Sequence, residues 1–337
     1  MDIITQGLLG ATVAQGGSRY SETRMATGIG FLAGILADAD VFIYSAKDTL
    51  YTIEYHRHFT HSLIFIPIGA LIATLLLWPL LKKRIAFGSL YLYCLLGYLL
   101  SGVLDALTSF GTYLYWPFSN ERVAWNLVSI IDPVVTLILL LSIVLGLKLK
   151  KTVFARAGLL LCCIYLLTSA WQLNRAQDYL YKLADKRGHS IERFVVKPSL
   201  GNILLWRSSY IYQDSIYIDA IRVGLSEIKH YPGSSIAQLS QHEIKSKFAE
   251  DSVLYSDIER FRYFSDDYLV WYPEKEGVIG DVRYALLPDS IMPLWGIEID
   301  ADHSEQHVRF VTFRNNNQSN RKRFYDMLKG RDVDPFP

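Results

Sequence analysis

The first half of the chain is organised as blocks of apolar residues separated by short polar loops. Four blocks are close to the roughly 20 residues with which an α-helix crosses a bilayer core, and they cover residues 63–81, 88–107, 127–147 and 157–173. A fifth block, residues 27–44, is apolar except for Asp38 and Asp40, and a shorter one covers residues 3–16. The pattern predicts an α-helical membrane domain of about five to six membrane segments over residues 1–174.

The second half of the chain changes from apolar blocks to alternation. Apolar and polar residues alternate at 215–223, 268–272 and 308–313, which predicts β-strands, whereas 235–248 and 320–328 are typical of helices. We therefore predict a soluble α+β, strand-rich C-terminal domain over residues 175–337. Its histidines lack the spacing of metal ligands, and we expect surface or packing roles for His189, His230, His242, His303 and His307.

Positive charge in the short loops predicts the orientation in the membrane. If there are six segments, three loops on one side hold the basic residues Arg19, Arg24, Lys82, Lys83, Arg84, Lys148, Lys150, Lys151 and Arg156. By the positive-inside rule that side is cytoplasmic. The opposite loops and the C-terminal domain then face outward. This predicts a multi-pass protein of the bacterial inner (plasma) membrane with a periplasmic C-terminal domain.

The composition agrees with a membrane protein and narrows the partners. The 337 residues are 51% hydrophobic, and their mean hydropathy of +0.18 exceeds ordinary soluble values. A net charge of +1, without a basic stripe, predicts no nucleic-acid partner; the expected partner is the lipid bilayer. The cysteines all lie inside predicted spans, so we expect packing and not disulfides or ligation for Cys94, Cys162 and Cys163.

Ionisable side chains in the predicted spans gather toward the outward face. Four carboxylates would together cost on the order of 10 kcal/mol if they were deep and unpaired: those of Asp38, Asp40, Asp105 and Asp132. His56 and His61 lie at the outward start of the span that follows the aspartate pair. Each residue alone has a simpler explanation, such as Asp132 capping a helix before Pro133. Their convergence on one side favours a common compensating cation.

Histidine and aspartate without thiolate suit zinc, manganese, iron or magnesium. We expect the divalent metal to be held by Asp38, Asp40, His56, His61 and Asp105, with Gln6 as a supporting amide. Asp38 and Asp40 lie about 200° apart on an ideal helix, so they share an ion only where the helix ends or unwinds. The candidates for catalytic roles are Asp132, as a general base, and His58.

Motifs along the chain resemble a known family. They are residues 1–11 (MDIITQGLLGA), 38–40 (DAD), 56–62 (HRHFTHS), 104–112 (LDALTSFGT), 116–118 (WPF) and 131–133 (IDP). This order is similar to that of bacterial inner-membrane proteins regarded as membrane-bound metal-dependent hydrolases (YdjM/YbcI-like). The resemblance continues through Pro198, Asn202, Trp206 and Arg207 and so covers nearly the whole chain. It implies distant similarity to zinc phospholipase C and zinc nucleases, with zinc as the first choice of metal and phosphoester chemistry.

Two positions depart from the family's pattern. The family has a histidine four residues before Asp105, one helical turn away on the same face, where this chain has Ser101. Proline usually precedes the aspartate pair, where this chain has Ala37. Ligation through water, or by His58, would keep a metal bound. A site that binds metal weakly or not at all is the alternative.

The leading interpretation is a membrane-bound, metal-dependent hydrolase. It would use metal-activated water against a phosphoester or lipid-linked substrate, such as a phospholipid, at the outer leaflet. The alternative, which Ser101 favours, is a catalytically degenerate membrane anchor whose outer domain binds an envelope partner. Transport through a polar path fits less well, because the carboxylates lie toward one face and not through the midplane. The sequence leaves the oligomeric state open.

Overall fold

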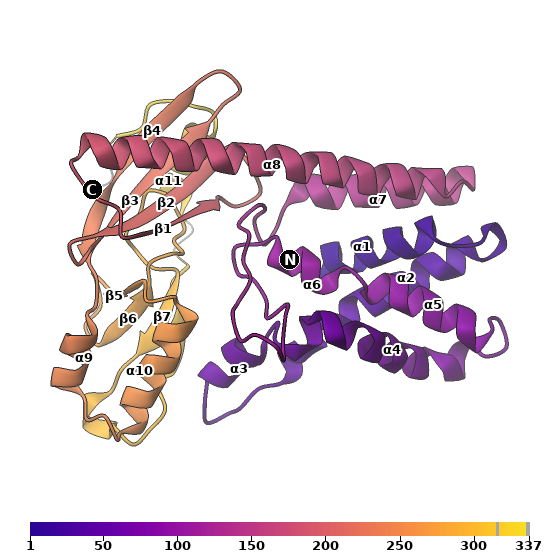
Figure 1. Cartoon of the computed structure of the whole chain (residues 1–337), viewed down its shortest axis with the longest axis horizontal. Coiled ribbons are helices and arrows are strands. Elements are labelled where there is room, and N and C mark those ends of the chain that lie inside the picture. The colour runs from indigo at the N-terminus through magenta and orange to yellow at the C-terminus, as the bar shows by residue number, and fades with distance from the viewer. Residues whose placement is uncertain (315–316, 335–337) are drawn as a thin grey trace. The chain divides into compact units, whose positions relative to one another are not determined.

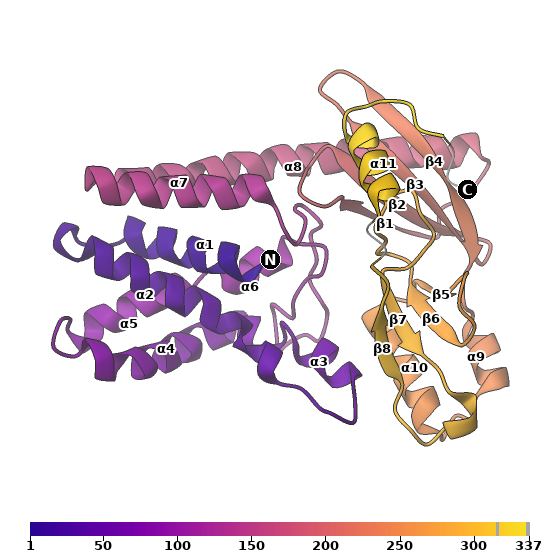
Figure 2. The ribbon, with the colours of Figure 1, turned by 180° about the vertical axis from the view of Figure 1, so that it is seen from behind.

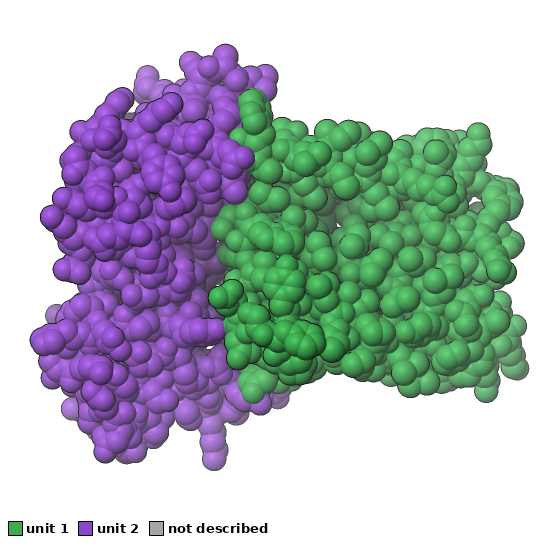
Figure 3. All heavy atoms as spheres, in the orientation of Figure 1, with its two compact units in different colours: residues 1–43, 55–171, 200–202 green, residues 44–54, 172–199, 203–337 purple. Residues whose placement is uncertain are grey.

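The computed structural model, drawn from two sides in Figures 1 and 2, describes residues 1–314 and 317–334. The chain forms two compact units (Figure 3). The first, here called the membrane unit, comprises residues 1–43, 55–171 and 200–202. The second, here called the C-terminal unit, comprises residues 44–54, 172–199 and 203–337. The main division between the units falls after residue 171, close to the expected boundary at 174. Two short segments depart from this order: residues 44–54 belong to the C-terminal unit and residues 200–202 to the membrane unit.

Helices build the membrane unit, and Figure 1 labels them α1 (Ile3–Gly16), α2 (Thr23–Leu36), α4 (Ile66–Leu81), α5 (Phe87–Tyr98), α6 (Ser101–Ala106), α7 (Pro133–Leu149) and α8 (Val153–Lys186), which ends in the C-terminal unit. Short 3-10 helices cover Tyr20–Glu22, Ala37–Phe42, Phe59–His61 and Leu63–Phe65. Helix α1 packs against α2, α5 and α7. Its crossing with α2 is so close that a Cβ on Gly30 would lie 2.5 Å from the Gly10 carbonyl oxygen, a backbone approach typical of membrane helices.

Within the described residues, four helical stretches are long and apolar enough to cross a membrane, namely Tyr20–Phe42, Leu63–Leu81, Phe87–Ala106 and Val153–Lys186. They confirm four of the predicted apolar spans. For the remaining long block, the predicted span 127–147 starts six residues before the helix does. Helix α7 begins only at Pro133, because Asp132 is its N-cap and proline suits the first turn of a helix.

Basic residues gather at one end of the membrane unit. The connections from α1 to α2, from α4 to α5 and from α7 to α8 lie together at the right of Figure 1. They contain the lysines and arginines noted in the sequence. The segments Ala37–Phe42 and Phe59–His61 and helix α6 meet at the other end of the bundle. The ionisable cluster and the basic loops are therefore at opposite ends of the helices.

The C-terminal unit contains two four-stranded antiparallel sheets, each with its strands in sequence order. The first has β1 (Arg193–Pro198), β2 (Leu205–Tyr212), β3 (Ser215–Val223) and β4 (Ile228–Ala237). The second has β5 (Leu269–Trp271), β6 (Val278–Asp281), β7 (Trp295–Glu298) and β8 (Arg309–Thr312). The helices of this unit include the end of α8, α9 (Gln241–Lys247), α10 (Val253–Phe264) and α11 (Gln318–Leu328), with a short 3-10 helix at Ala301–His303. Helix α11 lies against the first sheet (Figure 2), where Met327 is buried with Leu205 and Ala220.

The predicted strands at 215–223, 268–272 and 308–313 and the predicted helix at 320–328 are confirmed. The predicted helix at 235–248 is only partly right. Strand β4 continues to Ala237, and the helix starts after Ser240, whose side chain accepts a hydrogen bond from the Glu243 amide as an N-cap. Helix α10 was absent from the prediction.

A short segment from the first half of the chain is part of the C-terminal unit. Helix α3 (Leu50–Tyr55) begins with Leu50, which is 2% exposed in the core formed by α10 and the second sheet. The Thr49 hydroxyl donates to the Val308 carbonyl at 2.9 Å and accepts from the Phe310 amide at 2.9 Å. Residues 44–54 thus interrupt the membrane unit between the aspartate pair and the histidine motif.

One buried carboxylate joins α8 to the first sheet. Asp219 on β3 accepts two hydrogen bonds from the Arg187 guanidinium, at 2.7 and 2.9 Å, and lies 2.7 Å from the His230 ring. Burial alone would raise the pKa of Asp219, but the hydrogen bonds from His230 and Arg187 outweigh burial and lower this pKa. Its stabilising contribution is therefore present above the unfolded pKa of about 4 and is lost as the pH falls below it.

We expect Asp219→Asn to lower the free energy of unfolding of the C-terminal unit by about 2–4 kcal/mol, because a partly buried guanidinium and a partly buried imidazole lose their buried anion. Proteolysis of the full-length protein at increasing urea concentration, followed at this unit, measures the change. The variant should also lose less stability than the wild type between pH 5 and pH 3. Asp300→Asn, which removes an exposed carboxylate beside His303, is the control; an equal effect of both substitutions would contradict this assignment.

Candidate metal centre

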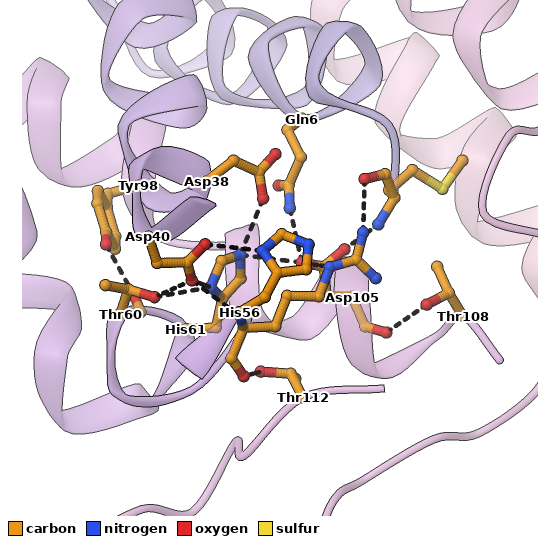
Figure 4. Close-up of polar contacts among 12 residues, drawn as sticks. Gln6, Asp38, Asp40, His56, Thr60, His61, Tyr98, Asp105, Thr108 and Thr112 are labelled. Atoms are coloured by element: carbon orange, nitrogen blue, oxygen red, sulfur yellow. Dashed lines mark hydrogen bonds and ion pairs between the residues drawn. The ribbon is translucent and has the colours of Figure 1, made fainter. Parts of the chain in front are cut away.

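The two aspartates of the DAD motif contact the two nitrogens of one imidazole. Helix α2 ends at Leu36, and the chain tightens into the 3-10 helix Ala37–Phe42, so Asp38 and Asp40 leave the regular α-helical spacing. Asp38 Oδ1 lies 3.3 Å from His61 Nε2, and Asp40 Oδ2 lies 3.3 Å from His61 Nδ1 (Figure 4). The predicted change of helix geometry at this pair is confirmed, and it gives the two carboxylates different partners.

Asp40 is saturated by contacts from the histidine motif. Its Oδ2 accepts hydrogen bonds from the Thr60 hydroxyl at 2.6 Å and from the Arg57 amide at 2.8 Å, and its Oδ1 lies 2.8 Å from His56 Nδ1. A carboxylate that contacts the far nitrogen of a ligating histidine fixes the tautomer and the orientation of the ring. Asp40 is thereby suited to position His61 and not to bind a metal itself.

The near nitrogen of His61 faces two carboxylates. Its Nε2 lies 2.9 Å from Asp105 Oδ2 and 3.3 Å from Asp38 Oδ1, and ligand atoms of the three residues lie within 4.8 Å of one another. All three side chains are buried, and Asp38, at 7%, retains the most exposure. Burial would lower the pKa of His61, but hydrogen bonds to Asp105, Asp38 and Asp40 outweigh burial and raise it to about 10. A cation at Nε2 would take the place of this proton, since both require the same lone pair.

The donor set fits a divalent metal. A tetrahedral zinc with bonds of about 2.0–2.1 Å holds its ligand atoms roughly 3.3 Å apart, which is close to the distances around His61 Nε2. Gln6 on α1 adds an amide: its Nε2 donates to Asp105 Oδ2 at 3.0 Å. Among the residues that the structure describes, its buried Oε1 has no hydrogen-bond partner. One imidazole nitrogen, two carboxylates and an amide oxygen are hard or borderline ligands that suit zinc, manganese or iron.

Positive groups contact both oxygens of the Asp105 carboxylate. The Arg57 Nε lies 3.1 Å from Asp105 Oδ2, and the terminal amine of Met1 contacts Asp105 Oδ1. The Arg57 Nη2 also donates to the Met1 carbonyl at 2.8 Å. Asp105 thus compensates the charges of Arg57 and the Met1 amine in addition to contacting His61. A bound metal ion would share this carboxylate with both cations.

Close packing of backbone brings Asp105 to His61. Helix α6 carries Asp105 and passes the His61 carbonyl at Gly102, where a Cβ would lie only 1.9 Å from that oxygen. Ser101, in the first turn of α6, is buried. The glycine was not recognised from the sequence, because its role depends on which backbone crosses the helix.

The other candidates lie elsewhere or have other partners. The His56 ring contacts Asp40 Oδ1, whereas His61 contacts the other oxygen of Asp40 through Nδ1, and His56 is not among the three residues whose ligand atoms come together at His61 Nε2. The His58 ring packs in an aromatic cluster, 4.5 Å from the Tyr113 ring and 5.9 Å from that of Trp116. Asp132 caps α7 through the Val134 and Val135 amides, and its Oδ2 accepts a hydrogen bond from Tyr165 at 2.9 Å.

A second group of ligand-type residues lies in the C-terminal unit. Asp48, Asp257 and His307 also have ligand atoms within 4.8 Å of one another. The Arg260 guanidinium, however, lies 2.9 Å from Asp48 Oδ2 and 2.7 Å from Asp257 Oδ1, and His307 Nδ1 lies 3.0 Å from Asp257 Oδ2. Arginine already supplies the compensating charge here. This cluster holds segment 44–54 in the C-terminal unit, in keeping with the packing role expected for His307.

Thr60 and Arg57 were missed as functional residues, and Gln6 was expected only as a supporting amide. Thr60 and Arg57 lie within the HRHFTHS motif, which was the available signal, and each contacts a carboxylate of the centre. No curated protein and no solved structure matches the chain. The family model described as YdjM inner membrane protein matches residues 1–176, which include every residue of this centre. The chain belongs to the YdjM inner membrane protein family.

Proposed function

We propose that the membrane unit is a metal-dependent hydrolase whose metal is held by Asp38, His61 and Asp105. The observation that carries this proposal is the convergence of two buried carboxylate oxygens, from Asp38 and Asp105, on His61 Nε2, with Asp40 in contact with the opposite nitrogen of the ring. Zinc is the first choice, and manganese, iron and magnesium are the alternatives. When bound, such a metal supplies an activated water as the nucleophile.

The residues of the centre have different roles in this proposal. Asp38, His61 and Asp105 would bind the metal. Asp40 and Thr60 contact His61 Nδ1 and thereby orient the imidazole with Nε2 toward Asp38 and Asp105. Water would reach the centre beside Asp38, the ligand that retains the most exposure. The contacts of Asp132 with α7 and Tyr165 do not favour it as the general base. The carboxylate oxygens of Asp38 are better placed to accept a proton.

A phosphoester or lipid-linked substrate is the class that we propose, and the centre would act at the outer face of the inner membrane. This orientation is supported by the basic loops, which lie at the end of the helices away from the centre. Helix α8 starts at the basic end, so the sequence that follows it would be periplasmic. The lipid bilayer would deliver the substrate laterally.

Metal content tests the proposal. Full-length protein in detergent should retain one or two equivalents of metal after loosely held ions are removed, and His61→Ala should reduce this by at least about tenfold, because a ligating nitrogen is lost. Elemental mass spectrometry measures both. His242→Ala, in the C-terminal unit, removes a histidine from helix α9 and serves as the control. A wild-type protein without metal above the His61→Ala background would end the proposal.

A second candidate is a degenerate centre in a membrane anchor whose C-terminal unit binds an envelope partner. Ser101 and the pairing of Asp105 with Arg57 and the Met1 amine favour it, because these cations already compensate the carboxylate. In that case the histidine substitution would leave the function unchanged.

A further inference from the structure

Arg57 is held in a backbone conformation that non-glycine residues rarely adopt. Its φ is +60°, and residues other than glycine occupy this region at a cost of about 1–3 kcal/mol. Hydrogen bonds fix it there. The Arg57 amide donates to Asp40, and its carbonyl accepts from the Tyr113 amide at 3.2 Å and the Thr112 hydroxyl at 2.8 Å. Glycine would adopt this backbone conformation at a lower free-energy cost. The presence of arginine at this position therefore indicates that its side chain has a role of its own.

That side chain has an unused donor. Arg57 is 4% exposed, its Nε faces Asp105 and its Nη2 donates to the Met1 carbonyl. The Nη1 atom is also buried, and no acceptor for it occurs within the described part of the chain. Leaving a buried donor of a charged group unsatisfied costs about 1–3 kcal/mol or more, so this position is suited to an acceptor from a ligand.

A second guanidinium approaches from another segment. Arg122 lies in the connection from α6 to α7, and its guanidinium carbon is 4.3 Å from the centre of the Phe110 ring; that of Arg57 is 5.1 Å from the same ring. The Arg122 Nη2 donates to the His56 carbonyl at 3.0 Å. Two planar guanidinium groups therefore lie within about 5 Å of the centre of one aromatic ring, one of them in contact with Asp105 and the other with the histidine motif.

We propose that Arg57 and Arg122 form a binding site for a phosphate-type oxyanion beside the candidate metal centre. Guanidinium forks match the oxygens of phosphate in geometry and charge, and stacking on Phe110 pre-organises both groups. The inference rests on the proposed function, since the anion would belong to the substrate of that centre. It adds that the substrate is recognised through its negative charge, whether a lipid headgroup or a soluble phosphomonoester carries it.

Phosphate binding and metal content, measured on the same samples, test this site. Full-length protein in detergent is titrated with inorganic phosphate by calorimetry, with and without added zinc. We expect Arg57→Lys and Arg122→Ala each to weaken phosphate binding by about tenfold or more, as expected for a lost hydrogen bond to a charged group. Arg122→Ala should keep the metal content of the wild type. Arg57→Lys keeps the charge and removes only the fork, so it remains informative if Arg57→Ala fails to fold. Arg84→Gln, which removes an exposed guanidinium at the basic end, should bind as the wild type does.

The two proposals fail in different ways. Zinc bound stoichiometrically, together with phosphate binding that is absent or equal in all variants, would overturn the oxyanion site and leave the metal centre intact. Phosphate binding that depends on Arg57 and Arg122 in a protein that binds no metal would support the oxyanion site and refute the hydrolase. Competition separates the two sources of phosphate: a short-chain phosphatidate that displaces phosphate better than glycerol 3-phosphate does would assign a lipid headgroup, and the reverse order would assign a soluble phosphomonoester.

Discussion

Asp105→Asn is expected to weaken metal binding by more than about 100-fold and to abolish metal-dependent turnover. The carboxylate is fully buried and lies 2.9 Å from His61 Nε2, and a neutral amide there would lose both a charged ligand and the anion that Arg57 and the Met1 amine face. Loss of a partner that merely supports a ligand costs 10–100-fold in affinity, so loss of a charged ligand should exceed that range. The protein should remain inserted, because its helices are unchanged.

Metal content by elemental mass spectrometry and hydrolysis of a phosphoester substrate measure the outcome. Asp132→Asn is the matched variant, since it also neutralises a buried aspartate at a helix end. It should retain metal and keep the cap of α7, because asparagine caps a helix about as well as aspartate does. Retained metal and turnover in Asp105→Asn would remove Asp105 from the centre, whereas loss of turnover alone in Asp132→Asn would assign Asp132 the role of base that the sequence suggested.

Gly102→Ala is expected to separate Asp105 from His61 and to abolish metal binding. The new Cβ would lie 1.9 Å from the His61 carbonyl oxygen and 3.0 Å from its carbonyl carbon. Both contacts are with backbone, so no rotamer change relieves them, and helix α6 or the segment Phe59–His61 must move away. Preorganised sites tolerate displacements of only about 0.5 Å, and hence the centre should lose its geometry.

Metal content of the detergent-purified variant tests this expectation, with circular dichroism to confirm that the helices persist. Gly88→Ala on α5 is the control, because a Cβ there meets nothing within 4 Å and alanine favours a helix. A Gly102→Ala protein with full metal content would show that the crossing of α6 and His61 is not what assembles the centre.

The apolar blocks predicted most of the helices because length and hydropathy are local properties of a sequence. Errors arose where a local feature interrupts a block, as at Asp132 and Pro133, whose cap delays the start of α7. In the C-terminal unit, the last three residues of β4, 235–237, were assigned to a helix. Strand β4 carries exposed side chains along one face, and pairing with β3, not its own sequence, determines its conformation.

The candidate residues were predictable as a group, but their individual roles were not. Burial costs identify an aspartate in an apolar block as needing a partner, and this holds equally for Asp38, Asp40 and Asp105. Which carboxylate faces Nε2 of His61 and which faces Nδ1 depends on how α2, α6 and the histidine motif pack. Asp132 met the same criterion, yet a helix N-terminus and Tyr165 compensate it.

Residues 44–54 make the C-terminal unit discontinuous along the chain. A fragment that starts at residue 172 lacks Leu50, and the hole left by a missing core leucine costs about 2–5 kcal/mol of the 5–15 kcal/mol that a domain typically has. It also leaves Arg260 without Asp48 and Glu54. During synthesis, residues 44–54 are made before the strands and helices against which they pack, so they cannot take their place in the core until the last third of the chain has been made. Truncation at residue 172 is therefore not expected to yield a native C-terminal unit, and binding studies of that unit require the full-length chain or a supplied copy of the missing segment.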